Sequence, residues 1–280
     1  MQDIRRIALP DGKLVPILGQ GTWNFGESAG SAKAEVAALQ LGIDLGMTLI
    51  DTAEMYADGG AEKIVGKAIA GRRDEVYLVS KVLPSNASRR GTALACEASL
   101  RRLGTDHIDL YLLHWMGSCP LAETVAALET LVTQGKIGSW GVSNLDTDEI
   151  QELLTLEHGD AVQTDQVLYN LARRGIEYDL LPYCRQHDIP LMAYSPIEQG
   201  RLLQHPALAA VSRRHAATPA QIALAWVLRE AGVIAIPKAG SLAHVKENRA
   251  CVDIALTAID LQELDSAFPA PRKKQSLAML

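Results

Sequence analysis

The feature that most constrains the fold of this chain is a regular alternation between short apolar runs and longer amphipathic stretches. Eight such pairs follow one another without a shift in composition or a linker. This alternation predicts parallel strands joined by helices, in either an open doubly wound sheet or a closed barrel. Eight pairs within 280 residues favour a single barrel domain over residues 1–280. The expected fold is therefore α/β, a (β/α)8 TIM barrel.

The expected strands are continuously apolar, as is typical of parallel strands buried on both faces. They span residues 17–21, 48–51, 76–80, 108–113, 138–142, 161–165, 189–193 and 233–236. The expected helices span residues 31–45, 61–70, 91–103, 121–134, 146–156, 176–186 and 219–229, with one starting near 241 and a short one at 261–268. Ahead of them, Pro10-Asp11-Gly12 predicts the turn of an N-terminal β-hairpin.

Charge and hydropathy exclude several classes of partner. The net charge is −6 and no Lys/Arg run is long, which argues against nucleic acid. No apolar stretch approaches the length of a membrane span, and the N-terminus lacks an apolar secretory core. We therefore expect a cytoplasmic protein, a monomer or weak homo-oligomer, that acts on a small molecule. Its four cysteines are scattered and form no CxxC, so free thiols are expected.

Polar residues gather where the predicted strands end, and in a barrel these ends surround one mouth that carries the active site. A carboxylate closing a buried strand is costly unless a cation or donors meet it, so Asp51 predicts a partner. Lys81 and His114 end the next two strands, and Tyr56 follows Asp51 in its loop. The other residues at predicted strand ends are Gly21, Thr22, Trp23, Trp115, Ser143, Asn144, Gln166, Tyr194, Ser195 and Lys238.

Each of these residues also has a purely structural interpretation. Asp51 and Lys81 could form an ion pair with no catalytic role. His114 could be a satisfied core histidine, and Tyr56 a half-buried phenol. The convergence of so many polar strand ends on one face favours a functional site over stability alone.

An amine beside a phenol suggests proton transfer. A free phenol has a pKa near 10, and an ammonium about 4 Å away, at an effective dielectric near 20, favours the phenolate by roughly 4 kcal/mol. Lys81 is therefore expected to bring the pKa of Tyr56 towards neutrality, while Asp51 holds Lys81 in place and partly offsets its effect. The set predicts a proton donor for a carbonyl oxygen, and the other reactant must be a cofactor or a metal.

A metal site is not expected, because the chain has no HExxH and its seven histidines are dispersed. The run Gly19-Gln20-Gly21 begins like a dinucleotide fingerprint, but no third glycine follows at the required spacing, so a Rossmann site is not expected. A phosphate could bind instead at Lys238 and the helix N-terminus near Ser241. Tyr194 could offer its ring to a flat heteroaromatic group.

These motifs resemble, in order and spacing, the signatures of the aldo-keto reductase family. The matching segments are Gly19-Gln-Gly-Thr-Trp23, Asp51-Thr-Ala-Glu-Met-Tyr56, Ser80-Lys81, Leu113-His-Trp115, Gly141-Val-Ser-Asn144, Gln166, Ala193-Tyr-Ser-Pro196 and Ile236-Pro-Lys238. The likeness runs from the N-terminal hairpin to Asn248. It implies a barrel that binds NADPH or NADP+ in extended form, with NADH possible.

The resemblance also implies roles for individual residues. Asp51, Tyr56, Lys81 and His114 correspond to the catalytic tetrad of the family, with Tyr56 as the general acid. The implied substrate contacts are Trp23, Tyr56, His114 and Trp115. The implied cofactor contacts are Gly21, Thr22, Trp23, Asp51, Ser143, Asn144, Gln166, Tyr194, Ser195, Ile197, Lys238, Ser241, His244, Glu247 and Asn248. The C-terminal tail, residues 269–280, is expected to approach the mouth and to influence specificity.

The implied reaction is the reduction of aldehydes or ketones to alcohols by direct hydride transfer, or its reverse. The overall texture resembles a bacterial subgroup that reduces methylglyoxal and other small aldehydes. One departure concerns the cofactor. Ala239 and His244 stand where many members have a hydroxyl residue and an arginine, and His244 lacks the fixed charge of a guanidinium. NADPH is expected because Lys238 is present, and NADH remains open.

Two other classes of function are compatible with a barrel. A Schiff-base lyase or aldolase would use Lys81 as a nucleophile of depressed pKa, but a carboxylate partner such as Asp51 keeps a lysine charged. A non-catalytic barrel that binds a nucleotide would have no need of the complete tetrad.

Overall fold

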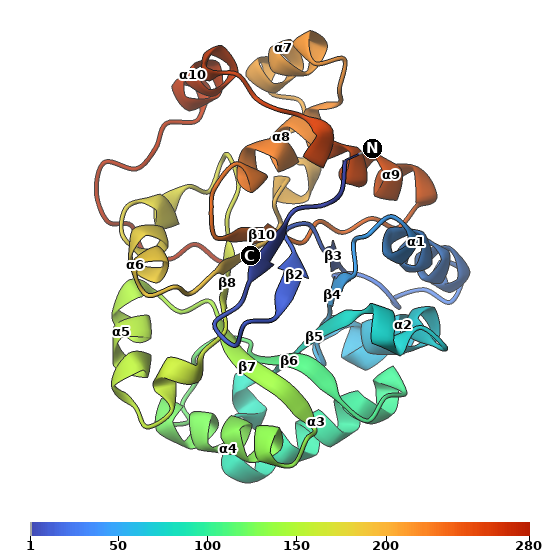
Figure 1. Cartoon of the computed structure of the whole chain (residues 1–280), viewed down its shortest axis with the longest axis vertical. Coiled ribbons are helices and arrows are strands. Elements are labelled where there is room, and N and C mark those ends of the chain that lie inside the picture. The colour runs from blue at the N-terminus through green and yellow to red at the C-terminus, as the bar shows by residue number, and fades with distance from the viewer. Residues whose placement is uncertain (1) are drawn as a thin grey trace.

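Eight parallel strands form the centre of the computed structural model, which describes residues 2–280 (Figure 1). They are β3 (Gln20–Gly21), β4 (Leu49–Asp51), β5 (Tyr77–Val82), β6 (Ile108–Leu113), β7 (Ile137–Ser143), β8 (Asp165–Leu168), β9 (Leu191–Tyr194) and β10 (Val233–Ala235). Each strand pairs with its neighbour in chain order. Parallel bridges from Leu18 to Ala235 and from Gly21 to Lys238 join the first strand region to the last. The (β/α)8 barrel is thereby confirmed.

Closure of the barrel explains the glycine at position 21. A Cβ atom there would lie 2.6 Å from the carbonyl oxygen of Ile236, which is closer than a real side chain can approach. Only glycine therefore permits the backbone of β3 to meet the segment after β10 at the rim of the barrel.

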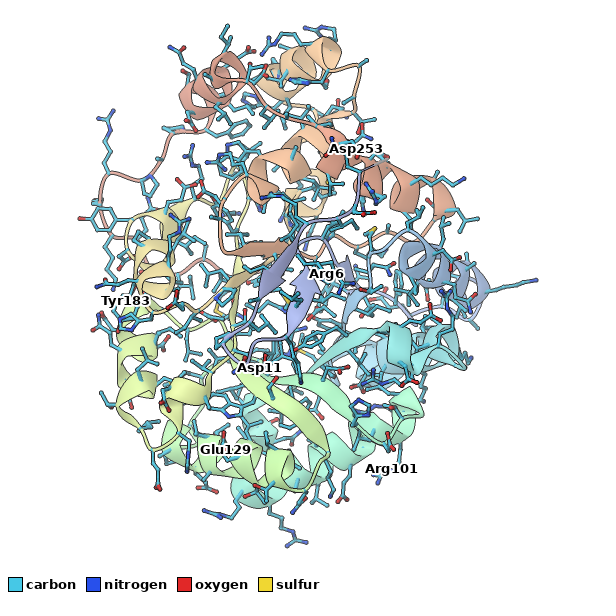
Figure 2. The ribbon with its side chains drawn as sticks, viewed as in Figure 1. Arg6, Asp11, Arg101, Glu129, Tyr183 and Asp253 are labelled. Carbon is cyan, nitrogen blue, oxygen red and sulfur yellow. The ribbon has the colours of Figure 1, made fainter. Side chains whose placement is uncertain are left out.

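A two-stranded hairpin closes one end of the barrel, as predicted. Its antiparallel strands are β1 (Arg6–Ala8) and β2 (Leu14–Pro16), and its turn uses Gly12 at φ 83°. Figure 2 shows Arg6 and Asp11 on this hairpin, in the middle of the view. The interior of the barrel is a small apolar cluster made by the hairpin and the strands together: Leu9, Val15, Leu49, Val79, Leu110, Leu112, Met192, Ile234 and Ile236. The opposite end of the barrel, at the carboxyl ends of the strands, is not covered by the hairpin and can hold a functional site.

A ring of helices surrounds the strands in Figure 1. They are α1 (Ala32–Asp44), α2 (Gly60–Ile69), α3 (Arg89–Leu103), α4 (Leu121–Thr133), α5 (Thr147–Thr155), α6 (Leu180–Gln186), α7 (Pro206–Arg214), α8 (Pro219–Leu228), α9 (Leu242–Ala250) and α10 (Ala258–Ala267). Several begin at side chains that cap the free N–H groups of the first turn, such as Ser88 for α3 and the capping boxes at Asp146 and Thr218. Within residues 2–280, no helix is both long and apolar enough to cross a membrane.

Three expectations about elements were wrong. The strand expected at 161–165 is β8, Asp165–Leu168, and residues 159–161 form a 3-10 turn instead. Asp165 is the first residue of this strand, and its side chain is fully buried. The helix expected at 176–186 starts only at Leu180, after a separate 3-10 turn. Helix α7 was not predicted; it packs on α8 and α10, which supply its apolar partners.

Candidate active site

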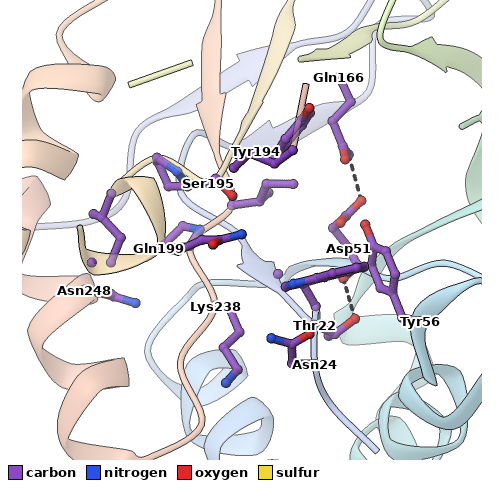
Figure 3. A pocket seen from close by; sticks show the side chains of 18 of the residues that line it. Thr22, Asn24, Asp51, Tyr56, Gln166, Tyr194, Ser195, Gln199, Lys238 and Asn248 are labelled. Atoms are coloured by element: carbon purple, nitrogen blue, oxygen red, sulfur yellow. Dashed lines mark hydrogen bonds between the residues drawn. The ribbon is translucent and has the colours of Figure 1, made fainter. Parts of the chain in front are cut away.

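A cavity of about 790 Å³ opens at the carboxyl ends of the strands (Figure 3). The residues named from the sequence that line it are Gly21, Thr22, Trp23, Asp51, Tyr56, His114, Trp115, Ser143, Asn144, Gln166, Tyr194, Ser195, Ile197, Lys238, His244, Glu247 and Asn248. Two others lie outside the lining. Lys81 is fully buried behind Asp51 and Tyr56, and Ser241 caps α9 by accepting a hydrogen bond from the N–H of His244.

The ammonium of Lys81 is held by three acceptors, one at the end of β4 and two on the segment that follows it. It donates to Asp51 Oδ2 at 2.9 Å, to the carbonyl oxygen of Thr52 at 2.8 Å and to Tyr56 Oη at 3.1 Å. An ammonium has three N–H groups, so every donor is used. The second oxygen of Asp51 accepts from Gln166 Nε2 at 2.8 Å, one of the bonds drawn in Figure 3. Charge and geometry are therefore fixed before any ligand binds.

Tyr56 is placed by a tight turn directly after it. It begins the 3-10 helix Tyr56–Gly59, in which Ala57 and Asp58 both have φ of 50°. Non-glycine residues in this left-handed region carry strain of roughly 1–3 kcal/mol each, which persists only where the surroundings impose it. The turn brings the phenol over Lys81 and leaves Tyr56 with 8% exposure, at the wall of the cavity.

The expected lowering of the pKa of Tyr56 is wrong. Burial raises the pKa of the phenol above its usual range; Lys81 acts in the opposite direction, and Asp51 adds to the increase. Burial by itself would lower the pKa of Lys81, but Asp51 and Tyr56 together raise it above its usual value. The ammonium and carboxylate together present little net charge to the phenol. Tyr56 is thus a neutral proton donor at physiological pH, with a cation beside its oxygen.

His114 is also neutral. Burial, assisted by the charge of Lys81, lowers its pKa to about 3. Its Nδ1 atom is buried without a hydrogen-bond partner among residues 2–280. The imidazole ring of His114 forms part of an aromatic wall of the cavity. Trp23 meets Tyr56 edge-on at 5.1 Å between ring centroids, and His114 lies 4.9 Å from Trp115 by the same measure.

A polar network occupies the adjoining wall of the cavity. Tyr194 Oη donates to Asn144 Oδ1 at 2.9 Å, and Asn144 Nδ2 donates to the carbonyl oxygen of His114 and to Ser143 Oγ. Ser143 in turn donates to the carbonyl oxygen of Gln166 at 2.8 Å. Both ends of the Asn144 amide are therefore engaged within the protein. This arrangement fixes the ring of Tyr194 and the hydroxyl of Ser143 at the cavity.

The far end of the cavity carries a cation. Lys238 Nζ lies 5.4 Å from the centroid of the Phe25 ring, and Figure 3 shows Lys238 away from Asp51 and Tyr56. His244, an exposed residue of α9, also reaches this end. The cavity thus runs from a buried ion pair and a neutral phenol to an accessible ammonium.

Several lining residues were not named from the sequence. They are Asn24, Met55, Pro196, Gln199, Gly200, Leu203, Ala220, Ile236, Pro237, Gly240, Met279 and Leu280. Most lie in loops that carry no charge pattern. The last two belong to the C-terminal tail, which reaches the mouth as expected.

No group of three or more His, Cys, Asp or Glu side chains in the described part of the chain is arranged to hold a metal ion. The four cysteines carry free thiols.

The sequence matches the model of the Aldo/keto reductase family over residues 17–268. The chain belongs to the aldo/keto reductase family. This reductase is 55% identical over 271 residues to methylglyoxal reductase YeaE of Escherichia coli, with 95% of each chain covered. It is 31% identical to the NADH-specific methylglyoxal reductase of the same species, over 87% of this chain and 91% of that one.

A solved structure gives the same result for the fold. The aldo/keto reductase of Klebsiella pneumoniae, crystallised with NADP and acetate, matches with a TM-score of 0.97 and 52% identity. The match covers 99% of this chain and 100% of that one. The barrel, the hairpin and the assignment as an oxidoreductase thus rest on both sequence and structure.

Proposed function

We propose that this reductase converts small reactive carbonyl compounds, methylglyoxal among them, to alcohols with NADPH. The observation that carries the proposal is the 3.1 Å contact between Lys81 Nζ and Tyr56 Oη, beside the Asp51 carboxylate, at the wall of the cavity. The methylglyoxal reductase relative supports the substrate class. The neighbour crystallised with NADP supports the cofactor.

The donor set of the cavity fits a nicotinamide dinucleotide. One end offers a fixed aromatic ring, Tyr194, together with the polar atoms of Ser143 and Gln166, which suit a flat ring bearing a carboxamide. The other end offers Lys238 and, near it, His244, which suit a phosphate group. When bound, the cofactor supplies the hydride that a carbonyl carbon accepts.

Proton transfer falls to Tyr56. Since burial raises its pKa, the phenol keeps its proton until a carbonyl oxygen that is gaining negative charge lies within reach. As the proton leaves, the phenolate forms beside the fixed ammonium of Lys81, and a charge pair 3.1 Å apart is stabilised by roughly 5 kcal/mol at an effective dielectric near 20. Lys81 therefore acts chiefly on the state in which the proton has moved, and Asp51 holds it in place.

His114 and the aromatic wall orient the substrate. A neutral imidazole can donate an N–H to the carbonyl oxygen without competing with Tyr56 for the proton. Trp23 and Trp115 flank this position. The same atoms would serve alcohol oxidation, with Tyr56 receiving the proton; reduction is the proposed direction because the phenol carries its proton at neutral pH.

The geometry argues against the Schiff-base alternative. A nucleophilic lysine needs a free, deprotonated amine, whereas all three N–H groups of Lys81 are occupied and Asp51 raises its pKa. Borohydride should therefore trap no substrate on Lys81.

A substrate panel tests the proposal. Methylglyoxal, glyceraldehyde, aromatic aldehydes, keto-steroids and sugars should be compared by the oxidation of NADPH and of NADH. We expect turnover to be fastest with methylglyoxal or another small aldehyde, and NADPH to be preferred to NADH. The absence of turnover with every carbonyl compound and both cofactors would contradict the proposed function.

A further inference from the structure

The loop between β9 and α7 is strained along the wall of the cavity. Three of its non-glycine residues have left-handed backbones: Ser195 with φ of 46°, Glu198 with φ of 50° and Gln199 with φ of 54°. Such a backbone is strained and persists only when its surroundings impose it. Residues 195–200, here called the 195–200 loop, therefore need a specific restraint.

Glu198 supplies that restraint from outside the cavity. Its carboxylate is buried, with 5% of the residue exposed, and does not line the cavity. It accepts hydrogen bonds from Asn170 Nδ2 at 2.9 Å, from Arg173 Nη2 at 3.0 Å and Nε at 3.2 Å, and from Arg201 Nη2 at 3.2 Å. Charge-assisted and two-pronged contacts of this kind are among the stronger hydrogen bonds in proteins.

One amide group ties two positions of the loop to the segment that follows β8. Asn170, which follows β8 and is fully buried, donates to Glu198 and also to the carbonyl oxygen of Ser195 at 2.9 Å. Its Oδ1 atom accepts from the N–H of Ala172 at 2.9 Å. Both the nitrogen and the oxygen of this amide are thus hydrogen-bonded. The position of the loop is therefore fixed by contacts with the barrel.

The restrained loop shapes the half of the cavity that we assign to the cofactor. Ser195, Ile197, Gln199 and Gly200 line the cavity while Glu198 between them faces away. Figure 3 shows Ser195 and Gln199 on the side of Lys238 and away from Tyr56. Loosening the loop would alter this wall and leave the ion pair at Asp51 untouched.

We propose that Glu198 is a positioning residue that holds the 195–200 loop in its strained form against the bound dinucleotide and so sets cofactor affinity. The inference rests on the proposed use of NADPH. Binding to a loop that is already ordered avoids the entropy of ordering it, so loss of the restraint should weaken binding without changing the chemical step.

The test measures NADPH binding by quenching of protein fluorescence in the whole chain. In Glu198→Gln the dissociation constant and the KM for NADPH should rise roughly tenfold, as expected for lost preorganisation. At saturating NADPH, kcat and the KM for the carbonyl compound should stay within about twofold of the parent, because the loosened loop lines the half of the cavity assigned to the cofactor and lies away from Tyr56.

Two further variants make the test specific. In Arg173→Ala the restraint is weakened, and since the side chain of Arg173 is 43% exposed its removal should leave the fold intact. The Kd for NADPH should again rise. Asp260→Asn is the matched control, because Asp260 is a buried carboxylate that accepts from Arg214 and His215 outside the cavity. It should lose stability without a change in the Kd for NADPH.

The outcomes separate this inference from the proposed function. If the parent binds NADPH and Glu198→Gln binds it equally well, the role of Glu198 is wrong while the proposed function stands. If Glu198→Gln does not fold, an unchanged Kd in Arg173→Ala overturns the role by itself. An equal loss of affinity in Asp260→Asn would show a general effect of destabilisation and would also overturn it. If the parent itself fails to bind NADPH, the proposed function fails and the inference with it.

Discussion

Lys81 Nζ lies 3.1 Å from Tyr56 Oη. The same nitrogen lies 2.8 Å from the nearer carboxylate oxygen of Asp51, and both charged side chains are almost completely buried. A buried ion pair is seldom the most stabilising use of two core positions. Here the pair places a fixed cation against the oxygen of a neutral phenol. This arrangement serves proton transfer rather than the stability of the fold.

Lys81→Met should lower the free energy of unfolding by about 3–5 kcal/mol, because the carboxylate of Asp51 would remain buried without its cation. The double variant Asp51→Asn/Lys81→Met should recover most of that loss, since no charge is then left unpaired. Urea unfolding measures both. Turnover should be lost in both variants, so the double variant should regain stability without regaining activity. A double variant as unstable as the single one would show that the pair is not the source of the loss.

Stability should depend on pH through His114. Its folded pKa of about 3 lies below the value of about 6.5 expected in the unfolded chain, so the unfolded state takes up a proton first as the pH falls. The stability contribution is complete above about pH 6.5 and is lost progressively towards pH 3. Between pH 7 and pH 5 the parent should lose about 2 kcal/mol more than His114→Gln. Equal losses in the two proteins, by urea unfolding, would mean that His114 is not held neutral.

His244→Arg should lower the KM for NADPH roughly three- to tenfold and leave the KM for NADH nearly unchanged. The guanidinium has a fixed charge and a fork that suits a phosphate, and only NADPH carries the additional phosphate. Steady-state kinetics with each cofactor decide the matter, and NADH serves as the internal control. Equal effects on both cofactors would place His244 away from the phosphate.

Lys274 fastens the C-terminal tail to the barrel. Its ammonium lies 3.2 Å from Asp179, 3.3 Å from Asp148 and 3.8 Å from Asp146, and residues 279–280 beyond it line the cavity. Lys274→Ala should release the tail and raise the KM for a small carbonyl compound several-fold, because part of the wall around the substrate would become mobile. The Kd for NADPH should not change.

The neighbouring Lys273 offers a matched control for the tail, since it makes no ion pair within the part of the chain that the structure describes. Lys273→Ala removes the same charge and should leave the KM of the carbonyl compound unaltered. If both lysine variants behave alike, net charge and not the position of the tail is responsible.

The barrel could be predicted because its signals are local. Apolar runs buried on both faces and capped amphipathic helices recur along the chain, and the order of the parallel strands follows from their order in sequence. Helix α7 was missed because it packs against α8 and α10, and only the folded structure brings these helices together. The limits of β8 were displaced because residues 159–161 form a 3-10 turn and the strand begins only at the buried Asp165.

The residues of the site could be predicted from the sequence more reliably than their pKa shifts. Residues at the predicted strand ends, together with those implied by the family resemblance, named more than half of the cavity lining, since all parallel strands end at one mouth. The pKa of Tyr56 was predicted in the wrong direction because the depth of burial depends on Trp23 and on the turn after Tyr56, neither of which a pairwise estimate with Lys81 includes. The restraint at Glu198 joins loops that only the fold brings together.

The most direct test of the account is the turnover of Tyr56→Phe. This change removes one oxygen and keeps the ring against Trp23, so the Kd for NADPH should stay within about twofold of the parent while the proton donor is lost. Reduction of methylglyoxal at saturating NADPH should fall by roughly 10²- to 10⁴-fold. Activity within a few-fold of the parent would contradict the account, because the proton would then come from a group other than the phenol beside Lys81.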